Sequence, residues 1–405
     1  MNKDSCRLCK SKSLYRFLDL GYHPHSDQFR NNIDEPEIWY PLRLNYCNDC
    51  GFVQLTNVVN PDVMYTKDYL YESSITSTAS NHWSEFAETV SNDINLPLGE
   101  TVVDIGSNDG TLLSKFKSIG YSVVGIDPCK EVADIANSRG IRTINGYFND
   151  ENMEKACPGK TVKLITGTNV FAHIDDLDSV MNTVCKYLSE DGVFVFESPY
   201  FGNFLEKYEY DTIYHQHLSY LSLKPLIPFF HKFGLEVYRV DKVDIHGGCF
   251  RVYINRIGNR PIQSSVKDML DSEYWGVEEL NHFSEKVKEN GLELFRLISE
   301  LYYSGNKIVA VSAPAKGNTL LNYTGIGRFL SFITDKSTLK QGRYTPGSHL
   351  KVMSDDLITE EKPDYGLLLA WNFSKEIISN NPSIKKWIIP IPSPTIVDSS
   401  KTSEE

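Results

Sequence analysis

The chain has 405 residues, 41% of them hydrophobic and 23% charged, and a formal net charge of −12. This length favours two or three domains, and the composition is typical of a globular protein. The acidic balance argues against a broad nucleic-acid-binding surface, so we expect no nucleic-acid partner.

No segment of the sequence predicts membrane attachment. The first five residues lack the apolar segment of a signal peptide, and apolar runs such as 367–371 are too short to span a bilayer. We therefore expect a cytoplasmic protein with no membrane partner.

Four of the eight cysteines form two Cys-x-x-Cys pairs near the N-terminus, Cys6 with Cys9 and Cys47 with Cys50. Each pair can present two thiolates to one ion, and two pairs complete a tetrahedral site. The alternative is a pair of disulfides or unliganded thiols, which the expected cytoplasmic location disfavours. We predict a structural zinc site in residues 1–65, a region that otherwise shows little periodic structure.

A helical pattern over residues 73–90 precedes a β/α alternation that extends from residue 101 to 199. Its first strand leads into the loop Asp104–Gly110. Later strands are expected at 123–127, 162–166 and 192–197, with a helix at about 175–188. The order predicts a parallel α/β sheet.

A polar helical segment is expected over 266–303, followed by a second β/α alternation. Its strands are predicted at 307–311, 329–335, 365–370 and 387–390, and a loop of small residues, 312–317, leads into its first helix. Residues 399–405 form a polar tail that we expect to be disordered.

The loop Asp104–Gly110 follows a strand and precedes a helix, as nucleotide-binding loops do in doubly wound folds. It lacks the G-x-G-x-x-G spacing of dinucleotide sites, and its acids would repel a pyrophosphate. Asp127 ends the next strand, where a carboxylate can bind ribose hydroxyls; a helix cap or turn acid is the alternative. Together they predict an adenosine ligand without a pyrophosphate, which S-adenosylmethionine satisfies. Its expected contacts are Asp104, Gly106, Ser107, Asn108, Gly110, Asp127 and Asn169.

Two histidine-bearing segments are candidates for an acceptor site. His173 follows the third strand and could contact a substrate, or could lie on the surface. The segment Tyr214–His217 could supply a base and an oriented hydroxyl, or could be an aromatic packing segment. Nothing nearby supplies further ligands for a metal at these histidines.

Basic segments in the second half suggest phosphate recognition, with solvated loops as the alternative. Lys316 and Asn318 begin a helix after the small-residue loop. Arg343, Tyr344 and His349 lie in a turn-rich stretch that starts at residue 340. Before the first helix, residues 69–74 combine aromatic rings with Ser73 and Ser74, and an N-terminal cap of that helix is the simple alternative for these two serines.

These motifs, taken in order, resemble the sugar-nucleotide C-methyltransferases of deoxysugar biosynthesis, notably the C-3 methyltransferases of 4-keto sugars. The shared segments are the two cysteine pairs and residues 71–74, 105–110, 214–217, 313–318 and 340–347. The resemblance implies an α/β fold with a zinc-binding domain (1–65), a Rossmann-like S-adenosylmethionine domain (66–260, with 66–100 as a leading helical segment) and a second Rossmann-like domain (261–398) that helps bind the nucleotide sugar.

The resemblance also places Tyr71, His173, Tyr214 and His217 around the sugar, with His215, Gln216, Lys316, Asn318, Arg343, Tyr344 and His349 as further substrate contacts. The family commonly reads Tyr-His-Glu-His where this chain has Gln216, which cannot ionise. If the glutamate supports the base in relatives, this chain must do without it, and His217 becomes the expected base.

The expected reaction is methylation at C3 of a nucleotide-linked 4-keto-6-deoxy sugar through an enolate, in branched-chain deoxysugar biosynthesis. His217 would remove the C3 proton, and Tyr214 or His173 would donate to the oxyanion. S-adenosylhomocysteine would be the coproduct, and a monomer is expected. The alternatives are an O- or N-methyltransferase, a zinc-ribbon RNA-binding or RNA-modifying protein, and a binding protein without activity.

Overall fold

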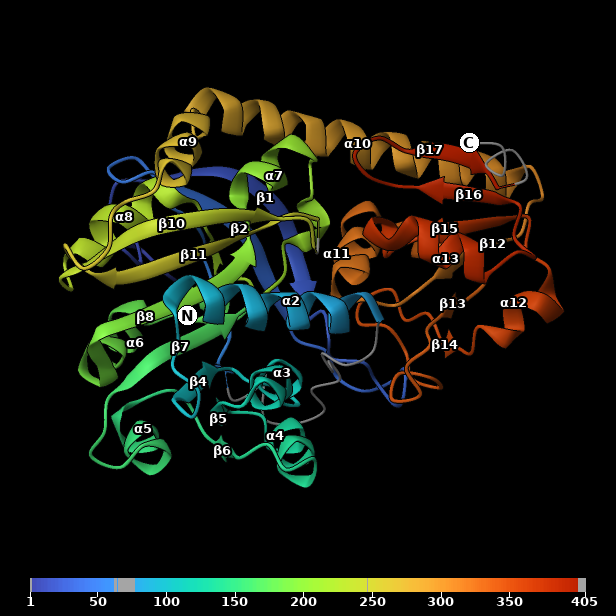
Figure 1. Cartoon of the computed structure of the whole chain (residues 1–405). Helices are drawn as coiled ribbons and strands as arrows, with labels where there is room; N and C mark the ends of the chain where they lie inside the picture. The colour runs from blue at the N-terminus through green and yellow to red at the C-terminus, as the bar shows by residue number, and fades with distance from the viewer. Residues whose placement is uncertain (1, 62–63, 65–76, 246, 400–405) are drawn as a thin grey trace.

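The computed structural model describes residues 2–61, 64, 77–245 and 247–399. Three sheets and their helices form an N-terminal, a central and a C-terminal part (Figure 1). The α/β architecture with two Rossmann-like parts and a small cysteine-bearing N-terminal part confirms the predicted fold class.

The N-terminal sheet has four antiparallel strands in the order β1-β2-β3-β9. Its first three strands are β1 (Leu14–Pro24), β2 (Trp39–Cys47) and β3 (Val53–Leu55). The expectation of little periodic structure here was wrong. Register shifts between Arg16 and Leu18 and between Asp19 and Tyr22 interrupt the alternation of β1, which hides the strand in the sequence.

The fourth strand of that sheet, β9 (Ser219–Tyr220), comes from the middle of the chain and pairs with β3. It begins two residues after His217. The N-terminal sheet is therefore joined directly to the segment that carries the candidate base.

The central sheet has seven strands in the order β10-β11-β8-β7-β4-β5-β6. Strands β4 (Thr101–Ile105), β5 (Ser122–Asp127), β6 (Thr143–Asn145), β7 (Val162–Thr168) and β8 (Leu188–Pro199) are parallel. Two further strands of this sheet, β10 (Leu235–Val243) and β11 (Cys249–Arg256), were not predicted from the sequence. They pair antiparallel with each other, and β11 also pairs antiparallel with β8.

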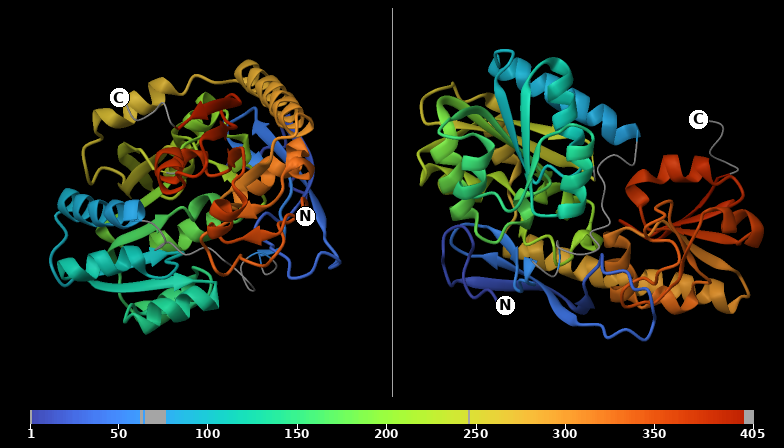
Figure 2. Two further views of the ribbon diagram at one scale, coloured as in Figure 1. Left: turned by 90° about the vertical axis from the view of Figure 1, so that its right-hand side faces the viewer. Right: turned by 90° about the horizontal axis from the view of Figure 1, so that it is seen from below.

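Helices cover both faces of the central sheet (Figures 1 and 2). Apolar side chains at helical spacing pack these helices against the sheet. In α3, for example, Leu112, Leu113 and Phe116 are buried. The helices are α2 (Ser77–Ile94), α3 (Thr111–Ile119), α4 (Lys130–Ser138), α5 (Asp150–Ala156), α6 (Leu177–Tyr187), α7 (Phe201–Glu206) and α8 (Leu223–His231), with 3-10 helices η1 (Phe171–His173) and η2 (Tyr210–Thr212).

The predicted helical connection is two helices, α9 (Ser264–Ser272) and α10 (Val277–Tyr303). Between them, the Glu273 carboxylate accepts from the backbone N–H groups of Leu223 and Lys224 at 2.6 and 2.7 Å. Helix α10 runs past the central and C-terminal parts (Figure 1) and packs against β1 and α11. It thereby holds the N-terminal and C-terminal parts together.

The C-terminal sheet has six strands in the order β14-β13-β12-β15-β16-β17. They are β12 (Ile308–Val311), β13 (Ile333–Thr334), β14 (Val352–Met353), β15 (Tyr365–Leu368), β16 (Lys386–Ile389) and β17 (Thr395–Asp398), and only β17 is antiparallel. The helices are α11 (Ala315–Thr324), α12 (Asp356–Glu361) and α13 (Ser374–Asn380), with η3 (Ile326–Phe329) and η4 (Trp371–Phe373). The strand expected at 329–335 is shorter, because Phe329 still belongs to η3 and β13 begins only at Ile333.

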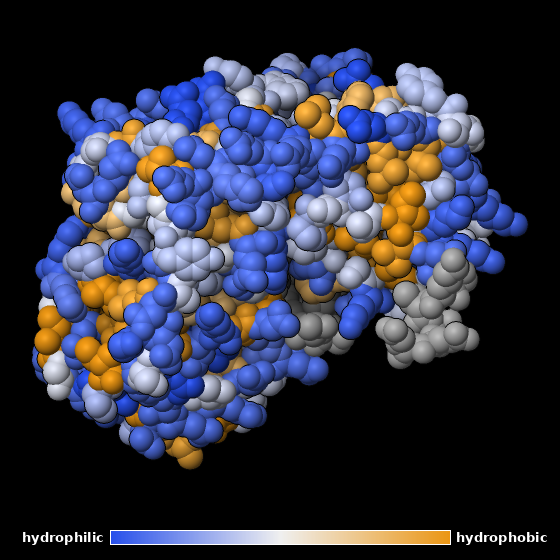
Figure 3. Space-filling view, turned by 90° about the horizontal axis from the view of Figure 1, so that it is seen from above, coloured by the Kyte–Doolittle hydropathy of each residue, from blue (hydrophilic) through white to orange (hydrophobic). Residues whose placement is uncertain are grey.

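The face that carries α10 is largely hydrophilic, with an apolar area over the C-terminal part (Figure 3). Leu292 of α10 and Ile396 of β17 are among the exposed apolar side chains. Among the described residues, no helix is both long enough and apolar enough to cross a membrane.

Candidate active site

The four cysteines of the two pairs converge at one place. All their sulfur atoms lie within 4.8 Å of one another, with 3.6 Å between Cys6 Sγ and Cys50 Sγ and 3.5 Å between Cys9 Sγ and Cys47 Sγ. Sulfurs around a tetrahedral zinc, each about 2.3 Å from the ion, lie about 3.8 Å apart. The cluster therefore fits one zinc ion with four protein ligands.

Both cysteine pairs use the same turn. The backbone N–H four residues after the first cysteine donates to its carbonyl oxygen, from Lys10 to Cys6 at 3.0 Å and from Gly51 to Cys47 at 2.8 Å. Lys10 and Gly51 have φ values of 64° and 80°. This shared geometry explains how a spacing of two residues turns both sulfurs of a pair toward one ion.

The loop Asp104–Gly110 lies at the carboxyl end of β4, as predicted, and leads into α3. Gly106 and Gly110 have φ values of 64° and 77°. A Cβ on Gly106 would lie 2.7 Å from Val170 Cγ2, and one on Gly110 would lie 2.9 Å from Ile141 Cγ2. The protein's own packing thus requires both glycines, whatever ligand approaches the loop.

Asp127 ends β5 and orders the loop. Its Oδ2 accepts from the Asn108 backbone N–H and its Oδ1 from that of Cys129, both at 2.8 Å. Burial raises the pKa of Asp127, while these two donors lower it. A carboxylate oxygen can accept more than one hydrogen bond, so Asp127 keeps capacity for a ribose hydroxyl.

The two acids of the loop itself, Asp104 and Asp109, have partners within the protein. Asp104 accepts from Thr166 Oγ1 at 2.7 Å, and burial raises its pKa to about 7. Asp109 lies 2.9 Å from Arg139, which neutralises it. Asp104 and Asp127 therefore remain as the carboxylates that a cationic ligand would stabilise in the charged form.

Two buried polar atoms beside the loop have no hydrogen-bond partner in the described part of the chain, Ser107 Oγ and Asn169 Oδ1. Asn169 follows β7 with a φ of 55°, and its backbone N–H donates to Glu197 O at 2.7 Å. Unpaired polar atoms next to carboxylates suit a ligand with hydroxyl and ammonium groups. The residues present therefore fit S-adenosylmethionine.

Replacing Asp127 with Asn is expected to weaken S-adenosylhomocysteine binding about 10- to 100-fold, because the amide leaves the backbone N–H of Asn108 or Cys129 without its acceptor and the predicted charge-assisted hydrogen bond to the ribose would become a neutral one. Calorimetric titration of the purified variant measures this. Asp134→Asn, on the exposed side of α4, is the matched control. Unchanged affinity in Asp127→Asn would contradict the ribose contact.

Three rings of the expected acceptor site lie together. The ring centroid of His217 is 4.0 Å from that of Tyr214 and 5.1 Å from that of His173. Tyr214 and His217 come from the segment between η2 and β9, and His173 comes from η1 at the carboxyl end of β7. The fourth residue expected around the sugar, Tyr71, lies outside the described residues, as do Ser73 and Ser74.

The hydrogen bonding of His217 fixes its tautomer. Its Nδ1 lies 2.8 Å from the carbonyl oxygen of Thr212, which can only accept, so Nδ1 carries the hydrogen and Nε2 the lone pair. Burial lowers the pKa of His217 to about 4, although Thr212 and Asp27 act to raise it. Burial and the neighbouring His217 lower the pKa of His173 to about 3. At neutral pH both rings are uncharged, and His217 can accept a proton.

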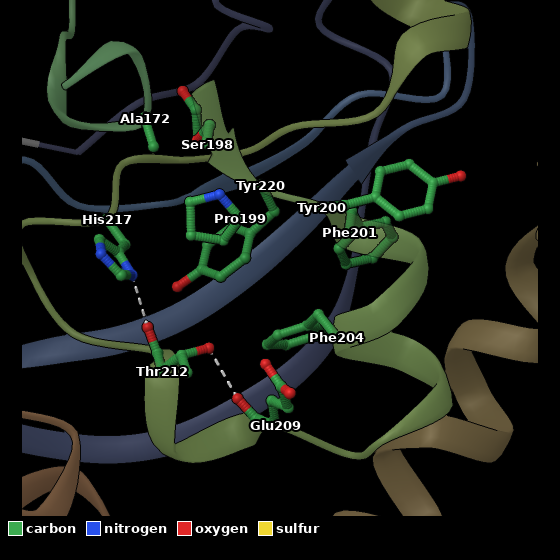
Figure 4. Close-up of a pocket in the computed structure, with 11 residues that line it drawn as sticks. Ala172, Ser198, Pro199, Tyr200, Phe201, Phe204, Glu209, Thr212, His217 and Tyr220 are labelled. Atoms are coloured by element: carbon green, nitrogen blue, oxygen red, sulfur yellow. Dashed lines mark hydrogen bonds between the residues drawn. The ribbon is translucent and has the colours of Figure 1, made fainter. Parts of the chain in front are cut away.

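A cavity lies beside His217 (Figure 4). Its lining combines aromatic and polar side chains: Ala172, Ser198, Pro199, Tyr200, Phe201, Phe204, Glu209, Thr212, His217, Ser219 and Tyr220. Within the described chain, Ser198 Oγ and Glu209 Oε1 have no hydrogen-bond partner. Burial, followed by the charge of Asp211, raises the pKa of Glu209 to about 7. The cavity is polar beside the candidate base.

His215 and Gln216 connect this segment to the N-terminal part. Both are buried, and the His215 ring packs edge-on against Tyr40 with 5.6 Å between centroids. Gln216 Nε2 donates to Asp27 Oδ2 at 2.8 Å.

The predicted phosphate-binding residues of α11 are engaged within the protein. Lys316 Nζ donates to Asn372 Oδ1 at 2.5 Å, lies 3.9 Å from Asp211 Oδ2 and sits 4.4 Å from the ring centroid of Trp371. Burial lowers the pKa of Lys316. Asn318 Nδ2 donates to Ser26 O at 2.7 Å. Lys316 therefore borders η2, and Asn318 borders the N-terminal part.

The segment that holds Arg343, Tyr344 and His349 also contacts the N-terminal part. Tyr344 and Arg30 exchange two backbone hydrogen bonds at 2.8 and 2.9 Å. His349 Nε2 lies 3.2 Å from Glu37 Oε2. Arg343, the residue before Tyr344, is half-buried. The residues expected to bind the nucleotide sugar thus lie where the N-terminal part meets the C-terminal part.

Sequence reasoning did not single out Asp27, Glu37, Thr166 or Glu209. Each is an isolated polar residue whose partner is far away in the sequence or whose environment depends on burial. The sequence drew attention to Asp211, in the segment that begins at Tyr210, but not to the neighbouring Glu209.

Comparisons with known proteins agree with this layout. The models that match describe a zinc binding domain at residues 6–65, a methyltransferase domain at 79–240 and a C-methyltransferase C-terminal domain at 244–392. C-methyltransferase NovU of Streptomyces niveus is 32% identical over 415 residues, which cover 98% of this chain and 98% of NovU.

Two solved structures are similar over a smaller share of the chain. An S-adenosylmethionine-dependent methyltransferase from Clostridium acetobutylicum ATCC 824 is 15% identical and covers 44% of this chain and 92% of its own, with a TM-score of 0.36. The PH0226 protein from Pyrococcus horikoshii OT3 is 14% identical and covers 46% and 94%, with a TM-score of 0.37.

The full-length relative and the domain models decide the assignment. The zinc binding domain model and the Cys₄ cluster identify a structural zinc, and the methyltransferase domain identifies S-adenosylmethionine as the methyl donor. The chain therefore belongs to the family of S-adenosylmethionine-dependent C-methyltransferases that includes NovU.

Proposed function

We propose that this enzyme methylates C3 of a nucleotide-linked 4-keto-6-deoxy sugar, in the biosynthesis of branched-chain deoxysugars. The observation that carries the proposal is the environment of His217, a neutral imidazole whose Nε2 bears the lone pair beside Tyr214 and His173. Carbon methylation needs a base for a C–H proton, whereas O- and N-methylation can proceed without one.

A 4-keto group acidifies the hydrogen on C3, so a weak base in a dry site can remove it. His217 Nε2 takes this proton, and the electron pair of the C–H bond passes into an enolate. Tyr214 and His173 lie within ring contact of His217, and one or the other would donate to the developing oxyanion. S-adenosylmethionine supplies the activated methyl group.

The protein's main contributions would be position and exclusion of water. Asn169 follows β7 and His173 comes four residues later, so donor and acceptor contacts share one strand end. The loop Asp104–Gly110, which we call the donor loop, follows β4, and β4 neighbours β7 in the sheet. This arrangement would set the methyl group against C3.

The nucleotide portion would lie between the N-terminal and C-terminal parts. There Asn318 contacts Ser26, Tyr344 contacts Arg30 and His349 contacts Glu37. The hydrogen bond between Asp27 and Gln216 connects this border to the segment of His217. Arg343 is a cation of this border, whereas Asp211, Asn372 and Trp371 surround Lys316. The positive charge of Arg343 supports a diphosphate-bearing substrate in a chain of net charge −12.

We expect the enzyme to exchange the C3 hydrogen of such a sugar with solvent when S-adenosylhomocysteine replaces the donor. Incubation in D₂O followed by NMR of the recovered sugar nucleotide measures deuterium at C3. The 4-hydroxy analogue is the control, because it lacks the acidifying ketone. Methyl transfer to oxygen or nitrogen, with no exchange at C3, would contradict the proposal.

A further inference from the structure

The carboxylate that Gln216 lacks is present beside it, supplied by a distant part of the chain. Asp27 Oδ2 accepts from Gln216 Nε2 at 2.8 Å, across 189 positions of sequence. Gln216 is 2% exposed, and its Oε1 receives no hydrogen bond from the residues that the structure describes. Asp27 is half-buried, and Gln216 directly precedes His217 in the chain.

Contacts from three segments hold Asp27 in place. The loop after β1 turns tightly there, with the Gln28 backbone N–H donating to His25 O at 3.1 Å and that of Phe29 donating to Asp27 O at 2.9 Å. Ser26 O accepts from Asn318 of α11, and both Ser26 and Asn318 are buried. The carboxylate therefore has a fixed position between the N-terminal loop, α11 and the His217 segment.

Asp27 also acts on His217 electrostatically. Its negative charge raises the pKa of His217, against the larger effect of burial. Other titratable groups around the ring and its cavity include His173 of η1, Tyr214 of the same segment, and Tyr200, Glu209 and Tyr220 of the cavity lining. His173 is uncharged at neutral pH, and the negative charge of Asp27 favours a positive His217.

We propose that Asp27 is a positioning residue for His217, providing through Gln216 the negative charge that a glutamate at position 216 would otherwise provide. The inference rests on the proposed function of His217 as the base. When Nε2 takes the C3 proton, the negative charge of Asp27 favours the imidazolium that forms. The proton stays on the imidazole and leaves to solvent after methyl transfer, so Asp27 exchanges no proton in the step.

The test relocates the charge. Asp27→Asn keeps a side-chain oxygen that can accept from Gln216 Nε2 but removes the charge, and kcat is expected to fall about 10- to 100-fold. The KM for the sugar nucleotide and the affinity for S-adenosylhomocysteine are expected to stay within about twofold. Adding Gln216→Glu restores one carboxylate and one amide to the pair, and kcat of the double variant should return to within about threefold of the wild type.

Asp19→Asn is the matched control. It removes a carboxylate from β1, the strand that precedes the Asp27 loop, at an exposed pair with Arg43, and should leave turnover unchanged. Methyl transfer and C3 exchange are measured for every variant, with thermal unfolding as the measure of folding.

Wild-type turnover in Asp27→Asn would overturn the inference, as would a folded double variant no faster than Asp27→Asn. If Asp27→Asn does not fold, a folded double variant below about a tenth of wild-type turnover would overturn it too. Absence of C3 exchange in the wild type would instead refute the proposed function, so the two failures are distinguishable.

Discussion

Replacing His217 with Asn is expected to reduce methyl transfer and C3 exchange about 10³-fold, within the range that general-base catalysis contributes. The asparagine amide can still donate to Thr212 O, the present partner of Nδ1 at 2.8 Å, but it offers no lone pair of comparable basicity. Affinity for S-adenosylhomocysteine should be unchanged, because the donor loop lies on β4 and β5.

Stopped-time assays of methyl transfer and NMR of C3 deuteration measure the two rates, and calorimetry measures donor affinity. His282→Asn, on the exposed face of α10, is the control. A second readout is the pH profile of the wild type. Because the pKa of His217 is about 4 in the free enzyme, the acid limb of kcat/KM that it causes should lie well below pH 6. Near-normal turnover in His217→Asn would assign the base elsewhere.

The sequence predicted the local motifs well, namely the loop after β4 and the cysteine cluster. The loop Asp104–Gly110 lies at the end of β4, and the four cysteines converge, because strand-turn-helix order and Cys-x-x-Cys spacing are short-range signals. Even here the physical reasons differ. Val170 contacts the position of a Cβ at Gly106, and nothing in the loop's own sequence reveals that neighbour.

Long-range pairing explains what the sequence could not provide. Because position 216 is a glutamine, the sequence predicted that the base His217 has no supporting carboxylate, yet folding brings Asp27 to the Gln216 amide. Lys316 resembled an exposed phosphate ligand, yet Asp211, Asn372 and Trp371 surround it. Strand β9 has two residues and no periodicity of its own, and it exists because β3 pairs with it. Such contacts depend on tertiary packing that local patterns do not encode.

The zinc cluster has a structural reason to matter for catalysis. Cys47 ends β2, β3 begins three residues after Cys50, and β3 pairs with β9 directly after the segment of His217. Cys6 and Cys47 are fully buried in the same apolar cluster as Phe196 and Leu221 of the central part. A structural zinc contributes on the order of 10 kcal/mol, comparable with the whole stability of a domain. Its loss should therefore release β3 from β9.

Replacing Cys47 with Ser is accordingly expected to abolish bound zinc and to lower methyl transfer more than about 100-fold, while S-adenosylhomocysteine affinity stays within a few-fold. The loss follows because the N-terminal part supplies Asp27 and borders the proposed sugar site, whereas the donor loop belongs to the central sheet. Elemental analysis, calorimetry and the turnover assay measure the three quantities. Cys185→Ser, a half-buried thiol outside the cluster, is the control. Full activity in zinc-free Cys47→Ser would show that the acceptor site holds its geometry without the ion.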